Sequence, residues 1–158
     1  MIYVGIDPGL SGAVAAIDHD GKIILLQDAP TFLVGGKHKS KRDYAQIGML
    51  AILRDIPRPN TAALELVHAM PGQGVTSMFT MGRGFGMWEM ALVSLVIPYD
   101  KITPQRWKGT MMYGMPKEKD TSRLRAQQLF PTADLKLKKH HGRADALLIA
   151  EYLRRTVR

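Results

Sequence analysis

The sequence contains no cysteine and no long apolar run. Without thiols, the chain can form neither a disulfide framework nor a thiolate metal site. No apolar segment approaches the roughly 20 residues that a membrane-spanning helix needs. The N-terminus also lacks the basic region and the cleavage site of a signal peptide. Together these absences predict a cytoplasmic protein without a membrane segment.

Acidic residues are also few in this chain. Lys and Arg number 22 against 14 Asp and Glu, which gives a formal net charge of +8 and a pI near 9.9. This excess indicates a polyanionic partner, either nucleic acid or an anionic membrane surface. A nucleotide cofactor is not favoured, because Pro30–Lys41 lacks a Walker A motif and Gly82–Gly86 lacks the dinucleotide-binding spacing.

The hydrophobic pattern predicts one α/β domain over residues 1–158, built on a mixed sheet. With 46% apolar residues the chain can form a single core, and no internal repeat or linker divides it. Residues 30–41 are expected to form a flexible basic loop. The predicted strands are residues 1–7, 12–18, 22–27, 61–67 and 95–99. The predicted helices are residues 40–55 with Ser40 as cap, 78–92, a short segment from 103, 121–130 and 143–155.

Two acids, Asp7 and Glu65, lie on strands that are otherwise apolar. If these strands are parallel neighbours about 4.8 Å apart, both carboxylates lie near one edge of the sheet. They then repel each other unless a proton or a cation intervenes. Structural alternatives exist for both, since Asp7-Pro8-Gly9 is good turn chemistry and Glu65 could pair with a basic loop residue.

A third acid, Asp145, lies in the first turn of the last predicted helix. The helix macrodipole favours a carboxylate there, which is a structural reason for it. However, Asp145 shares a helix face with Ile149 and Tyr152, and this apolar face is expected to pack on the sheet. The carboxylate would then lie near the other two acids, and either His141 or His140 could complete the set.

This set of side chains favours one kind of chemistry. Hard oxygen ligands without thiols suit Mg²⁺ or Mn²⁺. On a strongly basic surface the natural reaction is metal-assisted hydrolysis of a phosphodiester, in which one ion activates water and another stabilises the leaving oxygen. The residues therefore predict a metal-dependent nuclease.

Four motifs together resemble the RuvC-type Holliday-junction resolvases, and are similar to the shorter versions found in bacteriophages and prophages. They are Gly5–Gly9, Glu65 near the end of its strand, Gly82–Gly84 and Gly142–Ala146. The resemblance spans nearly the whole chain. It implies an RNase H-like fold with a five-stranded mixed sheet, a homodimer that engages a four-way DNA junction, and Mg²⁺-dependent paired nicking. A phage origin would place the protein in the host cytoplasm.

The resemblance also implies residue roles. Asp7, Glu65 and Asp145 match the metal-binding carboxylates of the family. An Asp usually provides the fourth ligand, and here His141 would replace it, which leaves Mn²⁺ as an alternative to Mg²⁺. Lys108 is similar in placement to a basic residue near the scissile phosphate and counts as a catalytic candidate. The substrate-binding candidates are His68, Arg83, Lys119, Lys37 and Lys39. The alternative for the lysines is a solvated surface.

Three other functions remain open on the sequence alone. An RNA-processing nuclease could share this fold and this site. A non-catalytic junction-binding protein would result if the changed fourth ligand had abolished cleavage. An actin-like nucleotide-binding domain also opens with a strand and an Asp-x-Gly turn, but that class needs two such domains, for which 158 residues are too few.

Overall fold

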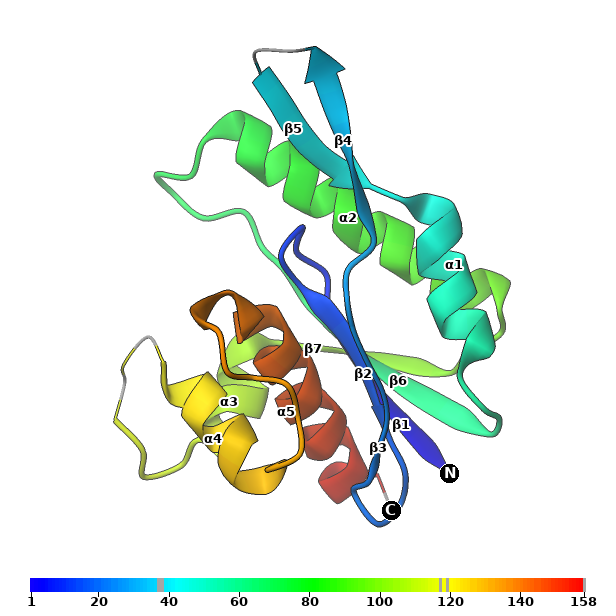
Figure 1. Cartoon of the computed structure of the whole chain (residues 1–158), viewed down its shortest axis with the longest axis vertical. Coiled ribbons are helices and arrows are strands. Elements are labelled where there is room, and N and C mark those ends of the chain that lie inside the picture. Colours follow the sequence, from blue (N-terminus) through cyan, green and yellow to red (C-terminus); the bar gives the residue numbers. More distant parts are fainter. Residues whose placement is uncertain (37–38, 117, 119, 158) are drawn as a thin grey trace.

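A computed structural model of the chain describes residues 1–36, 39–116, 118 and 120–157. Five of the described strands form one mixed sheet in the order β3-β2-β1-β6-β7 (Figure 1). β1 pairs antiparallel with β2 and parallel with β6, and β6 pairs parallel with β7. These strands are β1 (Ile2–Asp7), β2 (Ala13–Ile17), β3 (Ile23–Asp28), β6 (Asn60–Glu65) and β7 (Tyr99–Ile102). The predicted five-stranded mixed sheet is thus confirmed.

Helices cover both faces of this sheet (Figure 1). The alternation of side chains along β2 shows the two cores, because Ala13 and Ala15 pack with α5 while Val14 and Ala16 pack with α1 and α2. α3 and α4 join α5 on the first face. The helices are α1 (Gln46–Asp55), α2 (Val75–Ser94), α3 (Pro104–Met111), α4 (Thr121–Leu129) and α5 (His141–Thr156). None of the described helices is long and apolar enough to cross a membrane.

The segment predicted as a flexible basic loop is instead largely a β-hairpin. β4 (Thr31–Gly36) pairs antiparallel with β5 (Lys39–Tyr44), and Thr31 lies opposite Tyr44. The prediction of a helix from Ser40 was wrong for the same reason, since Ser40 lies in β5 and α1 begins only at Gln46. Cross-strand pairing provides hydrogen bonds to a glycine- and lysine-rich segment whose local sequence favours a loop.

The last strand and α2 also differ from expectation. The chain turns at Val96, whose φ is +53°, so that β7 begins at Tyr99 rather than at Leu95. α2 runs without interruption through its three glycines. Among them, Gly84 touches the ring of Tyr44, so a β-carbon there would collide with the phenol. This close approach fixes the end of the hairpin against α2, and the Tyr44 hydroxyl donates a hydrogen bond of 3.1 Å to the Pro8 carbonyl.

Candidate active site

Asp7 lies at the carboxyl end of β1, where the chain leaves the sheet through Pro8 and Gly9. The Gly9 N–H donates a hydrogen bond of 3.1 Å to Asp7 Oδ1, so the carboxylate is oriented by its own turn. Burial is the main reason that the pKa of Asp7 rises to about 7, and the charges of Glu65 and Asp145 raise it further. The turn chemistry expected of Asp-Pro-Gly is present, but it does not compensate the buried charge.

Glu65 lies beside Asp7 because β1 and β6 are parallel neighbours. The register pairs Ile6 with Leu64, so the two acids follow at adjacent positions of the sheet edge. Trp107 in α3 donates a hydrogen bond of 2.9 Å from Nε1 to Glu65 Oε1. Burial raises the pKa of Glu65, the Trp107 hydrogen bond lowers it, and the charge of Asp145 raises it. The described structure shows no basic residue in a salt bridge with Glu65.

Trp107 is a residue of this site that was not predicted from the sequence. Thr103 caps α3 as predicted, since its hydroxyl accepts from the Arg106 N–H. α3 then carries Trp107 into the core and Lys108 to the site, and the Lys108 ammonium lies 5.1 Å from the centre of the Trp107 ring. A large aromatic next to the predicted catalytic lysine was the available signal, but only the fold shows that its indole reaches Glu65.

Asp145 completes the group from the helix that packs on the sheet. Ile149 and Tyr152, its predicted neighbours on the helix face, are buried. Burial raises the pKa of Asp145, while the charges of Lys108 and His141 lower it. Its Oδ1 is buried and has no hydrogen-bond partner among the described residues. The sheet and α5 therefore bring together the three carboxylates that the sequence singled out.

The two histidines before Asp145 have different surroundings. His141 lines the same cavity as Asp145, and its Nε2 lies 3.6 Å from Asp120 Oδ1. His140 is buried, and its Nδ1 lies 3.7 Å from Asp134 Oδ1. Of the two, His141 is thus the one that lies beside Asp145 in the cavity.

The substrate-binding candidates are less uniform. His68 is exposed in the segment that follows β6. Arg83 pairs with Asp43 of the hairpin, so its charge is compensated within the protein. Lys39 is placed only through its backbone, which pairs with Gly36 in the hairpin. Lys37 and Lys119 lie outside the described residues. The role of each in binding stays a prediction.

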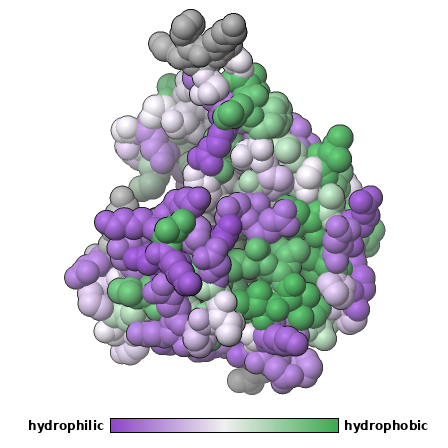
Figure 2. All heavy atoms as spheres, in the orientation of Figure 1, coloured by the Kyte–Doolittle hydropathy of each residue, from purple (hydrophilic) through white to green (hydrophobic). Residues whose placement is uncertain are grey.

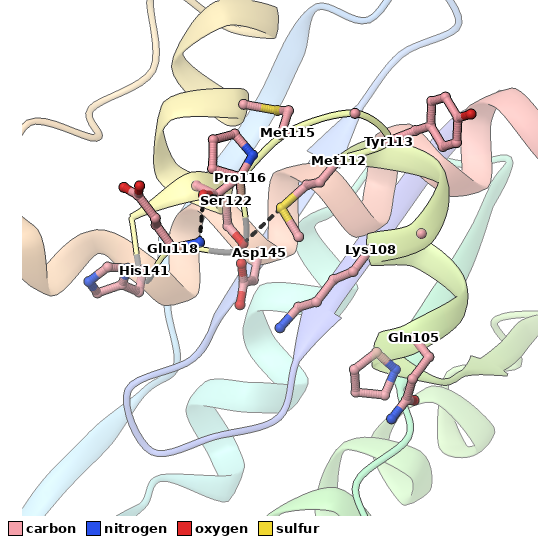
Figure 3. Close-up of a pocket in the computed structure, with 14 residues that line it drawn as sticks. Gln105, Lys108, Met112, Tyr113, Met115, Pro116, Glu118, Ser122, His141 and Asp145 are labelled. Carbon is pink, nitrogen blue, oxygen red and sulfur yellow. Dashed lines mark hydrogen bonds between the residues drawn. The ribbon is translucent and has the colours of Figure 1, made fainter.

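A cavity of about 940 Å³ opens beside Asp145. Lys108, His141 and Asp145 line it on the side of the carboxylates, and the turn after α3 lines it on the other. Figure 3 shows the Lys108 side chain extending toward Asp145, with His141 beyond the carboxylate. A phosphate in this part of the cavity would lie near the Lys108 ammonium group. It would also lie near the Asp145 carboxylate, and a cation could bind between the two.

Comparison with known proteins identifies the fold. The described structure matches Thermus thermophilus RuvC in complex with a Holliday junction substrate, with a TM-score of 0.62 and 15% identity over 96% of this chain and 92% of that one. A second structure of Thermus thermophilus RuvC gives a TM-score of 0.60 and 16% identity over 98% and 96% of the two chains. The chain has the RuvC fold. The predicted RNase H-like fold is therefore confirmed.

A sequence relative supports the same resemblance. The chain is 37% identical over 92 residues to the chloroplastic Holliday junction resolvase MOC1 of Chlamydomonas reinhardtii. That match spans 56% of this chain but only about a tenth of the length of the relative. No protein-family model matches the chain. The predicted resemblance to RuvC-type resolvases is thus confirmed in one sequence relative and in the RuvC fold.

Asp7, Glu65 and Asp145 are half-buried carboxylates that could hold a divalent cation. Carboxylate oxygens are the donors that Mg²⁺ and Mn²⁺ prefer. The raised pKa values of Asp7, Glu65 and Asp145 mean that their negative charges lack sufficient compensation within the protein. The buried Oδ1 of Asp145 also needs a partner. A cation between the carboxylates would compensate their charge and give the Asp145 Oδ1 atom a partner.

A second acidic group lies elsewhere in the RuvC fold. Asp18, His19 and Asp20, on the β2–β3 turn, bring ligand atoms within 4.8 Å of one another. This turn joins the strands at the end of the sheet opposite to Asp7. Its acids already have a structural role, since Asp18 Oδ1 accepts from the N–H groups of Asp20 and Lys22 at 3.0 and 2.9 Å. Among the described residues it is the only group of three whose ligand atoms come this close, so the oxygens of Asp7, Glu65 and Asp145 lie farther apart than this.

Proposed function

We propose that this chain is a metal-dependent endonuclease that resolves four-way DNA junctions by paired phosphodiester hydrolysis. The observation that carries the proposal is the gathering of three half-buried carboxylates at one edge of the sheet, where desolvation raises the pKa of each. The junction as substrate is supported by the similarity to a Holliday junction resolvase and to a RuvC that was solved with a Holliday junction substrate. The formal charge of +8 favours DNA as the partner.

Asp7, Glu65 and Asp145, together with His141, are the proposed ligands of Mg²⁺, with Mn²⁺ as the alternative. When bound, the metal would supply an activated water and charge stabilisation at the leaving oxygen. The protein itself orients these ligands, through the Gly9 N–H at Asp7 and the Trp107 indole at Glu65.

Lys108 is the proposed phosphate contact at the site. Its positive charge lowers the pKa of Asp7, Glu65 and Asp145, which supports a role beside these carboxylates. A non-bridging phosphate oxygen bound there would be held over the carboxylates. Figure 2 shows hydrophilic side chains gathered over the part of the molecule where α4 and the segment before α5 lie. That segment includes the exposed residues Lys136, Lys138 and Lys139, which are proposed to extend the contact to the DNA backbone.

We also propose that the active form is a homodimer built on α2. Val75 and Phe79 on this helix are 79% and 70% exposed, and Met90 and Val93 continue the same stripe. A β-carbon at Gly82, within the stripe, would meet nothing within 4 Å, so a second helix could approach closely. A stripe of this kind is self-complementary about a two-fold axis. Two copies would supply the two active sites that paired nicking requires.

The dimer proposal can be tested through particle mass. Phe79→Lys places a charge in the stripe and should reduce the mass in light scattering from twice the monomer mass of 17.6 kDa to that of the monomer. Leu124→Lys is the matched control, since Leu124 is an exposed apolar residue on α4. A wild-type chain that is monomeric at every concentration tested would contradict the proposal.

Two broader proposals complete this assignment. Residues 1–158 are proposed to act as one nuclease domain, because the described helices pack on both faces of a single five-stranded sheet. The proposed compartment is the cytoplasm, or the host cytoplasm if the gene is carried by a bacteriophage. Fractionation of cells that express the tagged chain checks the second point.

The deciding experiment is a nicking assay on a synthetic four-way junction, with Mg²⁺ or Mn²⁺, beside matched duplex DNA, flap DNA and structured RNA. Symmetric nicks confined to the junction are expected. Asp7→Asn should abolish them without weakening junction binding, whereas Asp55→Asn, at an exposed position on α1, should cut normally. Cutting of RNA alone would favour an RNA-processing nuclease. Tight junction binding without any metal-dependent product would favour a non-catalytic binding protein.

A further inference from the structure

Tyr44 lies at the end of β5, where the hairpin meets the rest of the protein. The residue is only 1% exposed. Its ring packs against Gly84 of α2, where a β-carbon would collide with the phenol. The Tyr44 N–H donates a hydrogen bond of 2.8 Å to the carboxylate of Asp43, and this carboxylate pairs with Arg83 of the same helix. The hairpin and α2 together therefore fix the position of the phenol.

The phenol reaches the turn that carries Asp7. Its hydroxyl donates a hydrogen bond of 3.1 Å to the Pro8 carbonyl oxygen. The N–H of the same peptide unit belongs to Gly9 and donates a hydrogen bond of 3.1 Å to Asp7 Oδ1. This peptide unit is trans and planar, so its C=O and its N–H point in opposite directions and rotate together. Tyr44 and Asp7 thus hold the two ends of one rigid group.

We propose that Tyr44 is a positioning residue that sets the orientation of the Asp7 carboxylate through the Pro8–Gly9 peptide unit. The inference rests on the proposed nuclease function, in which Asp7 is a metal ligand, and adds a residue that acts on this ligand from outside the site. Gly9 has no β-carbon, so the chain itself does little to restrain rotation of the peptide unit. The Tyr44 hydrogen bond supplies that restraint. It also polarises the amide and so strengthens the Gly9 N–H as a donor.

A second contact between the hairpin and this turn is weaker. The Arg42 guanidinium donates a hydrogen bond of 2.7 Å to the Ser11 hydroxyl, but both groups are exposed. The hydrogen bond from Tyr44 to the Pro8 carbonyl is buried, so water does not compete for it. Ser11 also lies beyond the peptide unit that donates to Asp7. Tyr44 is therefore the hairpin residue through which the turn at Asp7 is held.

Tyr44→Phe tests this role, because the ring stays on Gly84 and only the hydroxyl is lost. Removal of a group that orients a metal ligand typically weakens metal binding 10- to 100-fold. Calorimetry on the metal-free protein should therefore show an affinity for Mg²⁺ that is about tenfold lower or more. At a fixed, subsaturating Mg²⁺ concentration, kcat on the junction should fall similarly, while KM for the junction should change less than about twofold. Tyr99→Phe is the matched control, since it removes a hydroxyl that donates to Glu89 at 2.9 Å, and it should keep the wild-type values.

The Gly9 amide provides a readout that depends on neither metal nor cleavage. In an NMR spectrum of the metal-free, isotope-labelled protein, its proton signal should move upfield in Tyr44→Phe, because the hydrogen bond to Asp7 weakens. Asp7→Asn should move the signal in the same direction, whereas Tyr99→Phe should leave it in place. A merely structural role of Tyr44 would shift the signals around α2 and the hairpin but not this one.

The outcomes separate the positioning role from the nuclease function. Equal Mg²⁺ affinity in the wild type and in Tyr44→Phe would overturn the role of Tyr44, and so would an unchanged Gly9 signal. A wild type that binds neither Mg²⁺ nor Mn²⁺ and cuts no junction would instead remove the proposed function. The Gly9 signal would then decide by itself whether Tyr44 orients Asp7.

Discussion

The desolvated carboxyl of Asp7 predicts how the stability of the metal-free protein depends on pH. Burial, followed by the charge of Glu65, raises its pKa from 3.8 to about 7. A pKa difference of this size between the unfolded and the folded chain corresponds to about 4 kcal/mol. Because the folded state binds the proton more tightly, the stability that this group contributes is complete below about pH 4. It falls as the pH rises toward 7 and is absent above that.

Asp7→Asn isolates this contribution, because the amide stays neutral at every pH. Without metal, the variant should gain stability relative to the wild type as the pH rises, and the gain should be roughly 3 kcal/mol larger at pH 8 than at pH 5. The measurement is urea unfolding in EDTA, followed by circular dichroism. Asp55→Asn is the control, since Asp55 is exposed on α1 and should leave the wild-type pH profile unchanged.

Magnesium should narrow the difference between the two proteins at pH 8. At a free concentration 100 times its dissociation constant, a ligand of the folded state stabilises by about 2.7 kcal/mol, and this gain should appear in the wild type at pH 8. It should be small or absent in Asp7→Asn. Parallel pH profiles of the two proteins in EDTA would refute the reasoning, because the carboxyl would then not be held in an environment that penalises its charge.

Two further substitutions test the supports of the site. Gly142→Ala should lower the free energy of unfolding, measured by urea titration, by about 1–3 kcal/mol, because its β-carbon would collide with a backbone oxygen. Gly109→Ala in α3 is the control. Its β-carbon would meet no atom within 4 Å, so this variant should be as stable as the wild type or more stable. Trp107→Phe should weaken Mg²⁺ binding in calorimetry about tenfold or more, because Glu65 loses its hydrogen bond. Trp88→Phe, in the other core, should leave that affinity unchanged.

The parts of the fold that the sequence predicts well are those whose signal is local. The first strands alternate or run apolar over five to seven residues, and Thr103 followed by Pro104 marks the start of a helix by chemistry within a single turn. The hairpin from Thr31 to Tyr44 was missed because its stability comes from pairing between residues up to 13 positions apart and from the docking of Tyr44 on Gly84. Neither contact leaves a periodic pattern in the sequence.

In the candidate site, too, the residues with a local signal could be predicted and those with long-range contacts could not. The three acids could be found because a carboxylate within an apolar strand or on an apolar helix face is unusual in itself. The partners of Trp107 and Tyr44 could not be predicted, since a buried aromatic is ordinary and the sequence does not show what its polar atom contacts. Their roles depend on long-range contacts, Trp107 with Glu65 across 42 positions and Tyr44 with Pro8 across 36.

The spacing of the carboxylates depends on residues that carry no charge. Asp7 and Glu65 are placed by the register of β1 and β6, and Asp145 reaches them because α5 packs directly on β1 at Gly5. A β-carbon at Gly5 would collide with the carbonyl oxygen of Ala146, so a side chain there would push the helix away from the sheet. The approach of α5 to β1 therefore sets the distance between the acids and, with it, their mutual repulsion. Glycines in the motifs around the acids therefore serve the packing of α5 on the sheet, while the acids themselves serve the chemistry.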